Sequence, residues 1–237
     1  MKVVSIIIEI TLCALSSTWI SICGSLQLRE VLAMEDRFIS NMTFRVVLLG
    51  IQKIIGGNGL NTVLNYTKLS KYRDNLPPND HEKNQCLASE VAAVDKGVVD
   101  IFGNNGAAAI LFQVGRMQAK WGLEENPDTV SAARKIFAGM SEFDIARMAL
   151  ELMAGVVGAE TQSRVWAEVD GVDLLYHIED THAFGVTSKV PVCHVTSGFV
   201  TEILTWATGN EGWIVREEAC MAMGAPHCTH RVRKGGV

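Results

Sequence analysis

Cysteines near the C-terminus have the residue type and spacing of a metal site. Cys220 and Cys228 lie eight positions apart with a glycine and a proline between them, so the chain can turn back and bring both thiols together. An acidic pair at 217–218 precedes the first cysteine. Tetrahedral zinc binds four N, S or O donors at about 2.0–2.3 Å, and Cys193 is the natural fourth donor. The alternative is that these are core thiols, because free cysteines are among the most buried residues.

Either of two residues, Glu217 or Glu218, is a candidate for the acidic metal ligand. Glu217 and Cys220 are three apart, which on an ideal strand points them to opposite faces. Either the strand ends near Glu218, or Glu218 is the ligand. Nearby histidines are weaker candidates for nitrogen donors, since a lone histidine here is more often a surface residue: His194, His227 and His230.

No catalytic motif accompanies this cluster in the sequence. The chain has no nucleophile elbow, no His-Glu-x-x-His and no dinucleotide fingerprint. The Gly- and Ala-rich stretch 106–116 lacks the Lys-Ser or Lys-Thr of a phosphate loop, and close helix packing explains it better. We expect Arg116 to solvate a helix face instead of anchoring a carboxylate, because most charged residues are exposed.

Charge and cysteine usage exclude several classes of protein. The 237-residue chain has a net charge of -5 and no basic run except 231–234, so we expect no direct nucleic-acid binding. Six cysteines are too scattered for a disulfide scaffold, which favours a reducing compartment, the cytoplasm. The apolar segment 1–24 contains Glu9 and no Ala-x-Ala site, so we interpret it as an N-terminal helix or an early start codon in preference to a membrane anchor.

The C-terminal pattern resembles a known family. Glu217-x-x-Cys220-x7-Cys228, followed by an alternating strand, is similar to the end of the 4-vinyl-reductase-type (V4R) domain, which also forms the sensor of phenol-responsive bacterial activators. The resemblance implies one zinc bound by Cys193, Glu217, Cys220 and Cys228. Four protein ligands leave no open position for water, so the zinc would be structural. It also implies the ligand-binding fold of NO-signalling and Golgi-transport proteins, a homodimer formed through helices, and a domain over 34–237 after an apolar extension, 1–33.

Helical periodicity dominates the first half. We predict helices at 36–55, 58–69, 85–102, 106–121, 127–137 and from 141 to about 157, with breaks at Gly56-Gly57 and at 103–106. The prolines in 75–80 predict a loop. Apolar residues of 38–55 exceed what one face can bury, so this helix is the predicted dimer interface.

The second half changes to strand periodicity. Alternating runs at 164–170 and 174–178 flank Asp170-Gly171, which predicts a hairpin. A helix at 198–207, capped by Thr196-Ser197, and strands at 213–217 and 229–233 complete a β-β-α-β-β order. We therefore predict an α+β fold, with a helical N-terminal half packed on a four-stranded antiparallel sheet.

This architecture and the resemblance favour a pocket for an apolar small molecule, aromatic or lipid-like, with one hydroxyl or carbonyl. We interpret the chain as a hydrocarbon-binding sensor without its own output domain, so a separate regulator or effector protein would receive the signal. The alternatives are a reductase or accessory protein in (bacterio)chlorophyll vinyl-group reduction, and a dimeric scaffold. Candidate walls of the pocket are Phe112, Met117, Trp166, Tyr176 and Trp206.

Overall fold

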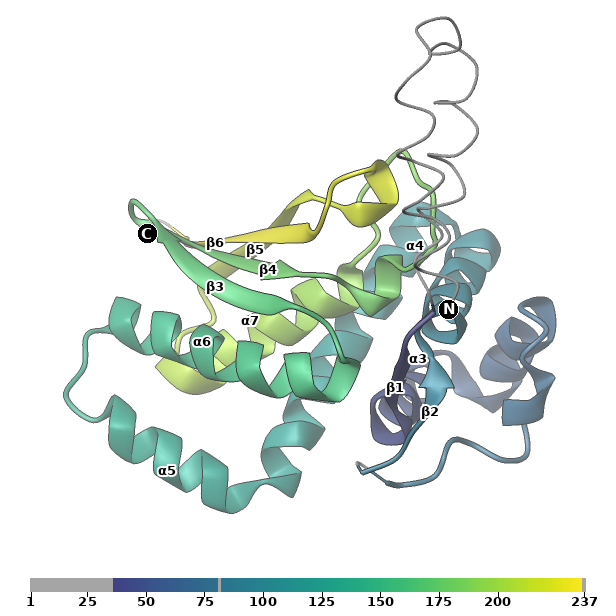
Figure 1. Ribbon diagram of the computed structural model, residues 1–237, viewed down its shortest axis with the longest axis horizontal. Helices are drawn as coiled ribbons and strands as arrows, with labels where there is room; N and C mark the ends of the chain where they lie inside the picture. Colours follow the sequence, from purple (N-terminus) through teal and green to yellow (C-terminus); the bar gives the residue numbers. More distant parts are fainter. Residues whose placement is uncertain (1–35, 81, 236–237) are drawn as a thin grey trace, which may run out of the picture. The chain divides into compact units, whose positions relative to one another are not determined.

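The computed structural model describes residues 36–80 and 82–235 (Figure 1). The predictions for the apolar segment 1–24 and for the extension 1–33 lie outside these residues. The domain boundary at residue 34 therefore stays a prediction.

A four-stranded antiparallel sheet forms the C-terminal half, in the order β3-β4-β6-β5. β3 (Val165–Asp170) and β4 (Asp173–Ile178) form the predicted hairpin, and Gly171 takes the positive φ of +64° that the turn requires. β5 (Trp213–Ala219) and β6 (Cys228–Lys234) complete the sheet. With α7 (His194–Thr208) between β4 and β5, the predicted β-β-α-β-β order is confirmed.

Helices cover one face of this sheet. α6 (Glu142–Thr161) packs on β3 and α7 packs on β5, while the other face of the sheet is free of helices in the described part of the chain (Figure 1). Strand alternation sends Leu174, Tyr176 and Val232 into the core beneath the sheet. α5 (Pro127–Phe137) lies beyond α6 and buries only two residues, Ala133 and Phe137.

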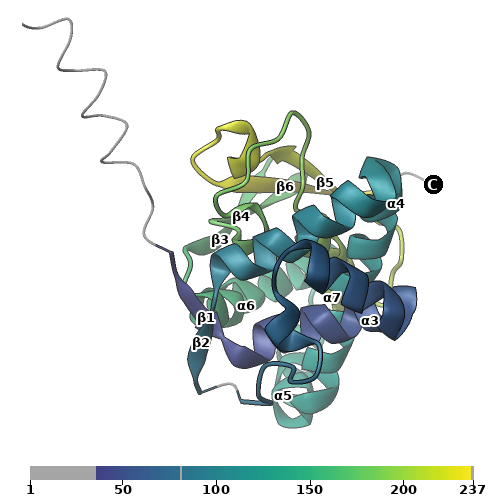
Figure 2. The same ribbon diagram turned by 90° about the vertical axis from the view of Figure 1, so that its right-hand side faces the viewer.

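The two long N-terminal helices are kinked where the sequence predicts that they end. α3 (Asn41–Tyr66) and α4 (Ala88–Glu125) continue through Gly56 and Gly103, which have positive φ values of +77° and +70°. Each glycine takes a left-handed conformation without a steric penalty, and packing of the two helices against each other maintains both segments (Figure 2). The predicted breaks at Gly56 and at 103–106 are therefore confirmed, because Gly56 and Gly103 both leave the helical conformation.

The N-terminal half also contains a two-stranded antiparallel sheet that the helical periodicity does not predict. β1 (Phe38–Ser40) pairs with β2 (Asn84–Leu87), so residues 38–40 and 85–87 are strands where the periodicity predicts helix. Short 3-10 turns follow at η1 (Ser70–Tyr72), η2 (Thr181–Ala183) and η3 (Met221–Met223).

α4 and α7 cross in direct backbone contact. A Cβ atom on Gly198 would lie 1.9 Å from the Phe112 carbonyl oxygen, and one on Gly115 would lie 1.9 Å from the Val195 carbonyl oxygen. Gly115 therefore confirms that close helix packing explains the small residues of 106–116. α7 begins at His194, so Thr196 lies inside it, and the predicted cap at Thr196-Ser197 is wrong.

A buried ion pair lies along the same crossing. Arg116 Nε lies 2.7 Å from the Glu202 carboxylate, whose side chain is 8% exposed. Arg116 thus anchors a carboxylate, against the expectation of a solvated residue. Within residues 36–80 and 82–235, no helix combines the length and apolar character needed to cross a lipid bilayer.

Candidate metal centre and adjoining cavity

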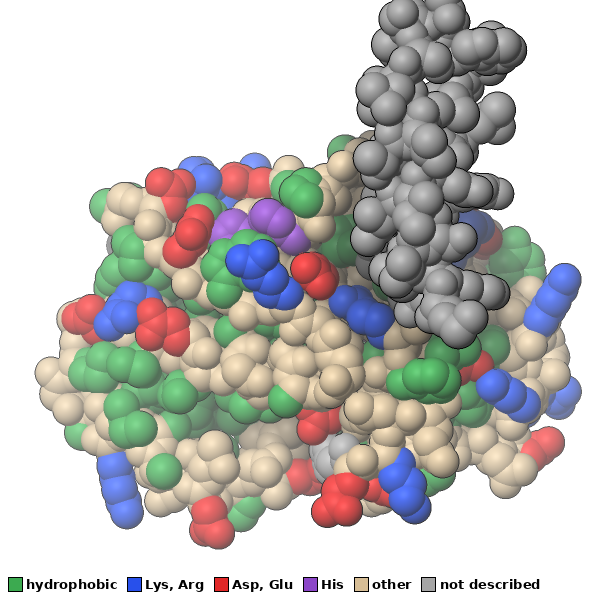
Figure 3. Space-filling model, viewed as in Figure 1, with side chains coloured by type: hydrophobic (Ala, Val, Ile, Leu, Met, Phe, Trp, Pro, Cys, Tyr) green, Lys and Arg blue, Asp and Glu red, His purple; other side chains and the backbone are tan. Residues whose placement is uncertain are grey.

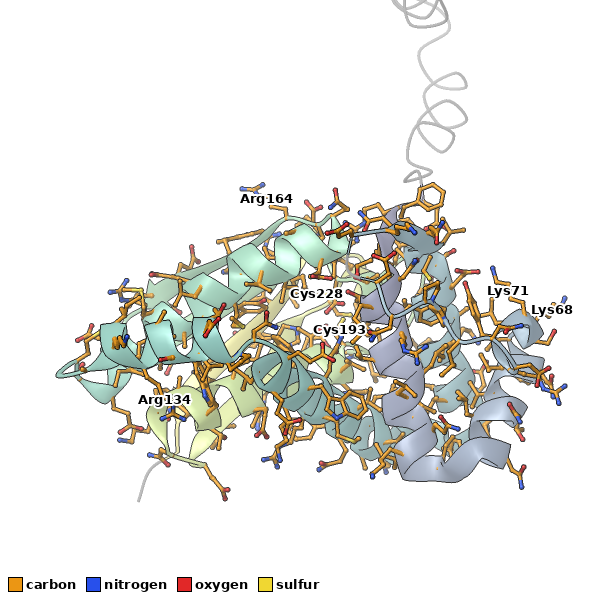
Figure 4. The ribbon with its side chains drawn as sticks, turned by 90° about the horizontal axis from the view of Figure 1, so that it is seen from below. Lys68, Lys71, Arg134, Arg164, Cys193 and Cys228 are labelled. Atoms are coloured by element: carbon orange, nitrogen blue, oxygen red, sulfur yellow. The ribbon has the colours of Figure 1, made fainter. Side chains whose placement is uncertain are left out.

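The predicted metal ligands meet at one point under the sheet. The donor atoms of Cys193, Glu217, Cys220 and Cys228 all lie within 4.8 Å of one another. The Cys193 sulfur is 3.3 Å from that of Cys228 and 4.0 Å from that of Cys220. Cys193 and Cys228 lie close together where α7 meets the sheet (Figure 4). A tetrahedral centre with Zn–S bonds of about 2.3 Å would place its sulfurs about 3.8 Å apart, so the spacing fits such a centre.

A bulge in β5 decides which acid faces the cluster. Glu217 pairs with His230 and Ala219 pairs with Thr229, so Glu218 is an extra residue in the ladder. The inserted residue shifts the alternation, and Glu217 and Cys220 point to the same side despite their odd spacing. Glu218 instead accepts a hydrogen bond from Arg231 on the exposed side, at 2.7 Å.

Burial and mutual hydrogen bonds shift the pKa values of the groups in the cluster. Burial raises the pKa of Glu217 to about 8 and raises the pKa of the Cys193 thiol well above its usual value. Hydrogen bonds with the Cys193 and Cys228 thiols lower the pKa of Cys220. One oxygen of Glu217 accepts from the Cys193 amide at 2.9 Å, while the other is buried with no partner among the described residues. A buried, unpaired carboxylate oxygen beside three thiols is what a divalent cation would satisfy.

The three neighbouring histidines make other contacts. Nδ1 of His230 lies 3.2 Å from the Ser197 hydroxyl, and burial lowers its pKa to about 4. The His227 ring lies against Trp166, with ring centroids 4.8 Å apart. His194 is half-buried at the start of α7. None of the three joins the cluster in the part of the chain that is described.

A cavity of about 590 Å³ lies between the helices and the sheet. Its walls come from α3, α4, α5, α6, α7, η2 and β4, and most are apolar. They include Ala149, Met153, Phe199, Ile203 and Trp206. Lining residues at the α5–α6 side, such as Leu152 and Val156, are exposed by 40% and 48%, whereas Tyr176 and Ile178 at the sheet are buried. The cavity therefore opens between helices and ends at the sheet.

The buried end of the cavity is polar. Asp180 accepts hydrogen bonds from the Thr196 hydroxyl and the His182 amide, and Nδ1 of His182 bonds the Asp95 carboxylate. Burial lowers the pKa of His182, but the nearby Asp95 more than offsets it and raises that pKa to about 9. The Tyr176 hydroxyl is buried and has no partner among the described residues. The sequence offered little signal for this set, because its members are spread over α4, η2 and α7.

Two of the five predicted wall residues line the cavity, Tyr176 and Trp206. Phe112 and Met117 lie on α4 outside the lining, and Trp166 lies on the opposite face of the sheet from Tyr176. Trp166 pairs with His177 and stacks on it with ring centroids 4.7 Å apart. Figure 3 shows histidine side chains grouped over the strands on this outer face. The prediction that Trp166 and Tyr176 share one pocket is wrong because the register puts Tyr176 opposite Ala167.

Residues 176–234 match the family described as the V4R domain. This stretch is similar to the V4R domain. All four residues of the cysteine and glutamate cluster lie within the matched stretch, as do Tyr176 and α7. No curated protein matches the chain.

The similarity to solved structures covers more of the chain than the match to the V4R family does. An Fe(II) unliganded H-NOX protein from K. algicida has a TM-score of 0.51 at 10% identity, covering 84% of this chain and 98% of that one. An H-NOX protein from S. oneidensis in the Fe(II)NO ligation state has a TM-score of 0.50 at 11% identity, covering 81% and 99%. The phenol-responsive sensory domain of PoxR with phenol has a TM-score of 0.45 at 20% identity, covering 67% and 79%. The H-NOX structures confirm the predicted α+β fold of the NO-signalling type.

Proposed function

We propose that this protein is a zinc-containing module that binds or senses an apolar small molecule in the cavity between its helices and sheet. The observation that carries the proposal is a cavity of about 590 Å³ that has apolar walls and a buried polar end. This volume and lining are typical of small-molecule sites. The V4R domain, which contributes the inner end of the cavity, supports the same interpretation.

The chain's own residues would do the binding. Apolar walls on α5, α6 and α7 contribute by removing ligand surface from water, at about 25 cal/mol per Å². The buried polar groups near Tyr176 fix the orientation of the ligand. We propose that a separate regulator or effector protein receives the signal.

The cavity assignment is tested with Nile red, an uncharged fluorescent dye, titrated into the purified protein. We expect saturable binding of one dye per chain. Leu152→Trp fills the mouth from α6 and should weaken binding at least tenfold, whereas Ile136→Trp, on an exposed side chain outside the lining, should leave it unchanged. Equal binding by both variants, or no saturable binding, would reject a ligand site in this cavity.

We propose that Cys193, Glu217, Cys220 and Cys228 hold one structural zinc. The support is the spacing of the donors and the buried, unpartnered oxygen of Glu217. The ion would join the start of α7 to both final strands, so its binding free energy would contribute to folding.

Zinc content and melting temperature test this assignment together. Cys228→Ser should lose stoichiometric zinc and melt at a lower temperature, because one bond of the site is removed. Cys86→Ser is the matched control, since Cys86 is also buried and free but lies outside the cluster. Wild-type protein without zinc, and a Cys228→Ser variant that melts like it, would show that the thiols are only core residues.

We also propose a homodimer located in the cytoplasm, in keeping with the free thiols of the described cysteines. The predicted interface on 38–55 needs correction, because Met42 and Val46 are buried within the chain itself. The remaining support is the exposed Ile54, Ile101 and Phe102, beside the kinks of α3 and α4. A monomeric mass at micromolar concentration would reject the dimer.

A further inference from the structure

The buried end of the cavity presents one unpaired hydrogen-bonding group. Tyr176 is 1% exposed, lines the cavity, and its hydroxyl has no partner among the described residues. Leaving a buried donor unpaired costs free energy, and such groups are rare in folded proteins. A ligand oxygen at this end of the cavity would accept the hydrogen bond.

The charges of the lining discriminate against an anionic ligand. No lysine or arginine is among the described lining residues, whereas three of them are acidic: Glu125, Glu160 and Asp180. His182, the remaining ionisable neighbour at the buried end, is paired with Asp95. A ligand carboxylate would lose its hydration without gaining a cationic partner.

The buried end of the cavity also disfavours a cationic ligand. Both oxygens of Asp180 already accept hydrogen bonds, from Thr196 and from the His182 amide. An ammonium group would have to give up its hydration for acceptors that are already engaged. The polar end therefore suits an uncharged group.

The volume of the cavity is larger than a single aromatic ring requires. An apolar cavity of about 150 Å³ holds one benzene molecule, and this cavity is about 590 Å³. Its lining extends from the exposed Leu152 and Val156 to the buried Ile178. The space therefore accommodates several rings or a long chain that enters from the α5–α6 side.

We propose that the ligand is an uncharged multi-ring or long-chain hydrophobe with a single hydroxyl or carbonyl, which enters polar end first and accepts a hydrogen bond from Tyr176. This inference rests on the proposed function, because it names the class of molecule that the same cavity takes.

The test compares three fluorescent probes that share one four-ring body: pyrene, 1-pyrenemethanol and 1-pyrenecarboxylate. Each is titrated into the full-length wild-type protein and into Tyr176→Phe, followed by pyrene emission, and phenol is titrated by calorimetry as a one-ring comparison. Wild type should bind 1-pyrenemethanol about tenfold more tightly than pyrene, the gain expected for one well-formed hydrogen bond, and should bind the carboxylate more weakly than pyrene. Tyr176→Phe should lose the preference for the alcohol while keeping its affinity for pyrene.

The outcomes separate this inference from the proposed function. Pyrene binding with no preference for the alcohol, or tightest binding of the carboxylate, overturns the inference and leaves the cavity a hydrophobic ligand site. Tight binding of phenol without any binding of pyrene overturns the size argument alone. If none of the four molecules binds, both proposals fail. If Tyr176→Phe does not fold, the comparison of the probes on the wild-type protein still tests the inference.

Discussion

Gly198→Ala should be among the most damaging single-methyl changes in the chain. The added Cβ would lie 1.9 Å from the Phe112 carbonyl oxygen and 2.8 Å from its carbon. Both neighbours are backbone atoms of α4, so no side chain can rotate away. Relief requires α4 and α7 to separate by more than about an ångström along their contact.

The expected loss of unfolding free energy follows from the contacts between α4 and α7 that this separation would break. Overpacking a core costs about 1–3 kcal/mol, and here the whole crossing must move, so we expect about 3 kcal/mol or more. For a domain of this size, that lowers the melting temperature by about 6–12 °C. Urea unfolding, monitored by circular dichroism at fixed zinc concentration, gives the free energy directly.

Two further variants make the reasoning refutable. Gly155→Ala, on α6 with no atom within 4 Å of the added methyl group, should stabilise the protein by about 0.5–1 kcal/mol. Gly115→Ala forces apart the same two helices, so the double variant with Gly198→Ala should cost less than the sum of the singles. A Gly198→Ala protein within about 1 kcal/mol of wild type, or fully additive costs, would show that the crossing is not a rigid backbone contact.

Two buried ion pairs predict measurable changes in the free energy of unfolding. Because the pKa of His182 is raised to about 9 by Asp95 despite burial, its stabilising contribution is complete below its unfolded value of about 6.5 and is lost as the pH rises through 9. The contribution is roughly 3 kcal/mol, and His182→Gln should flatten the dependence of unfolding free energy on pH between 6.5 and 9; an unchanged slope contradicts the pair. Arg116→Met leaves Glu202 with only Lys120, 3.6 Å away, and should cost about 2 kcal/mol. Replacing both members, as Arg116→Met with Glu202→Leu, should recover most of that loss in the same unfolding assay, and no recovery would place the cost in lost packing instead.

The local signals in the sequence predicted local structure well. Asp170-Gly171 predicted the β3–β4 hairpin because its turn needs a residue with positive φ. The same property of glycine predicted the break at Gly103, which leaves the helical conformation and separates the two segments of α4. The packing of α3 against α4, which supports the segments on both sides of each glycine, does not follow from the sequence alone.

In the candidate site, too, some features were predicted from the sequence and others depend on strand pairing and register. The four proposed metal ligands were predicted from the resemblance to the V4R domain together with residue type and spacing, whereas the bulge that turns Glu217 and not Glu218 toward the cluster arises from strand pairing. The cavity walls depend on register. Trp166 and Tyr176 both lie on the hairpin, yet a single step of register places them on opposite faces of the sheet.

The backbone contact between α4 and α7 has a consequence for the motion of the protein. With Gly115 and Gly198 at the crossing, the two helices cannot slide or tilt without a collision between main-chain atoms. They form a fixed floor that carries Val195, Thr196 and Ile203 to the cavity. The least tightly packed wall of the cavity is α5, which buries only Ala133 and Phe137, whereas α6 packs on β3 and α7. The entry and exit rates of a ligand would then depend on how readily α5 moves away, while its selectivity would depend on the wall formed by α4 and α7.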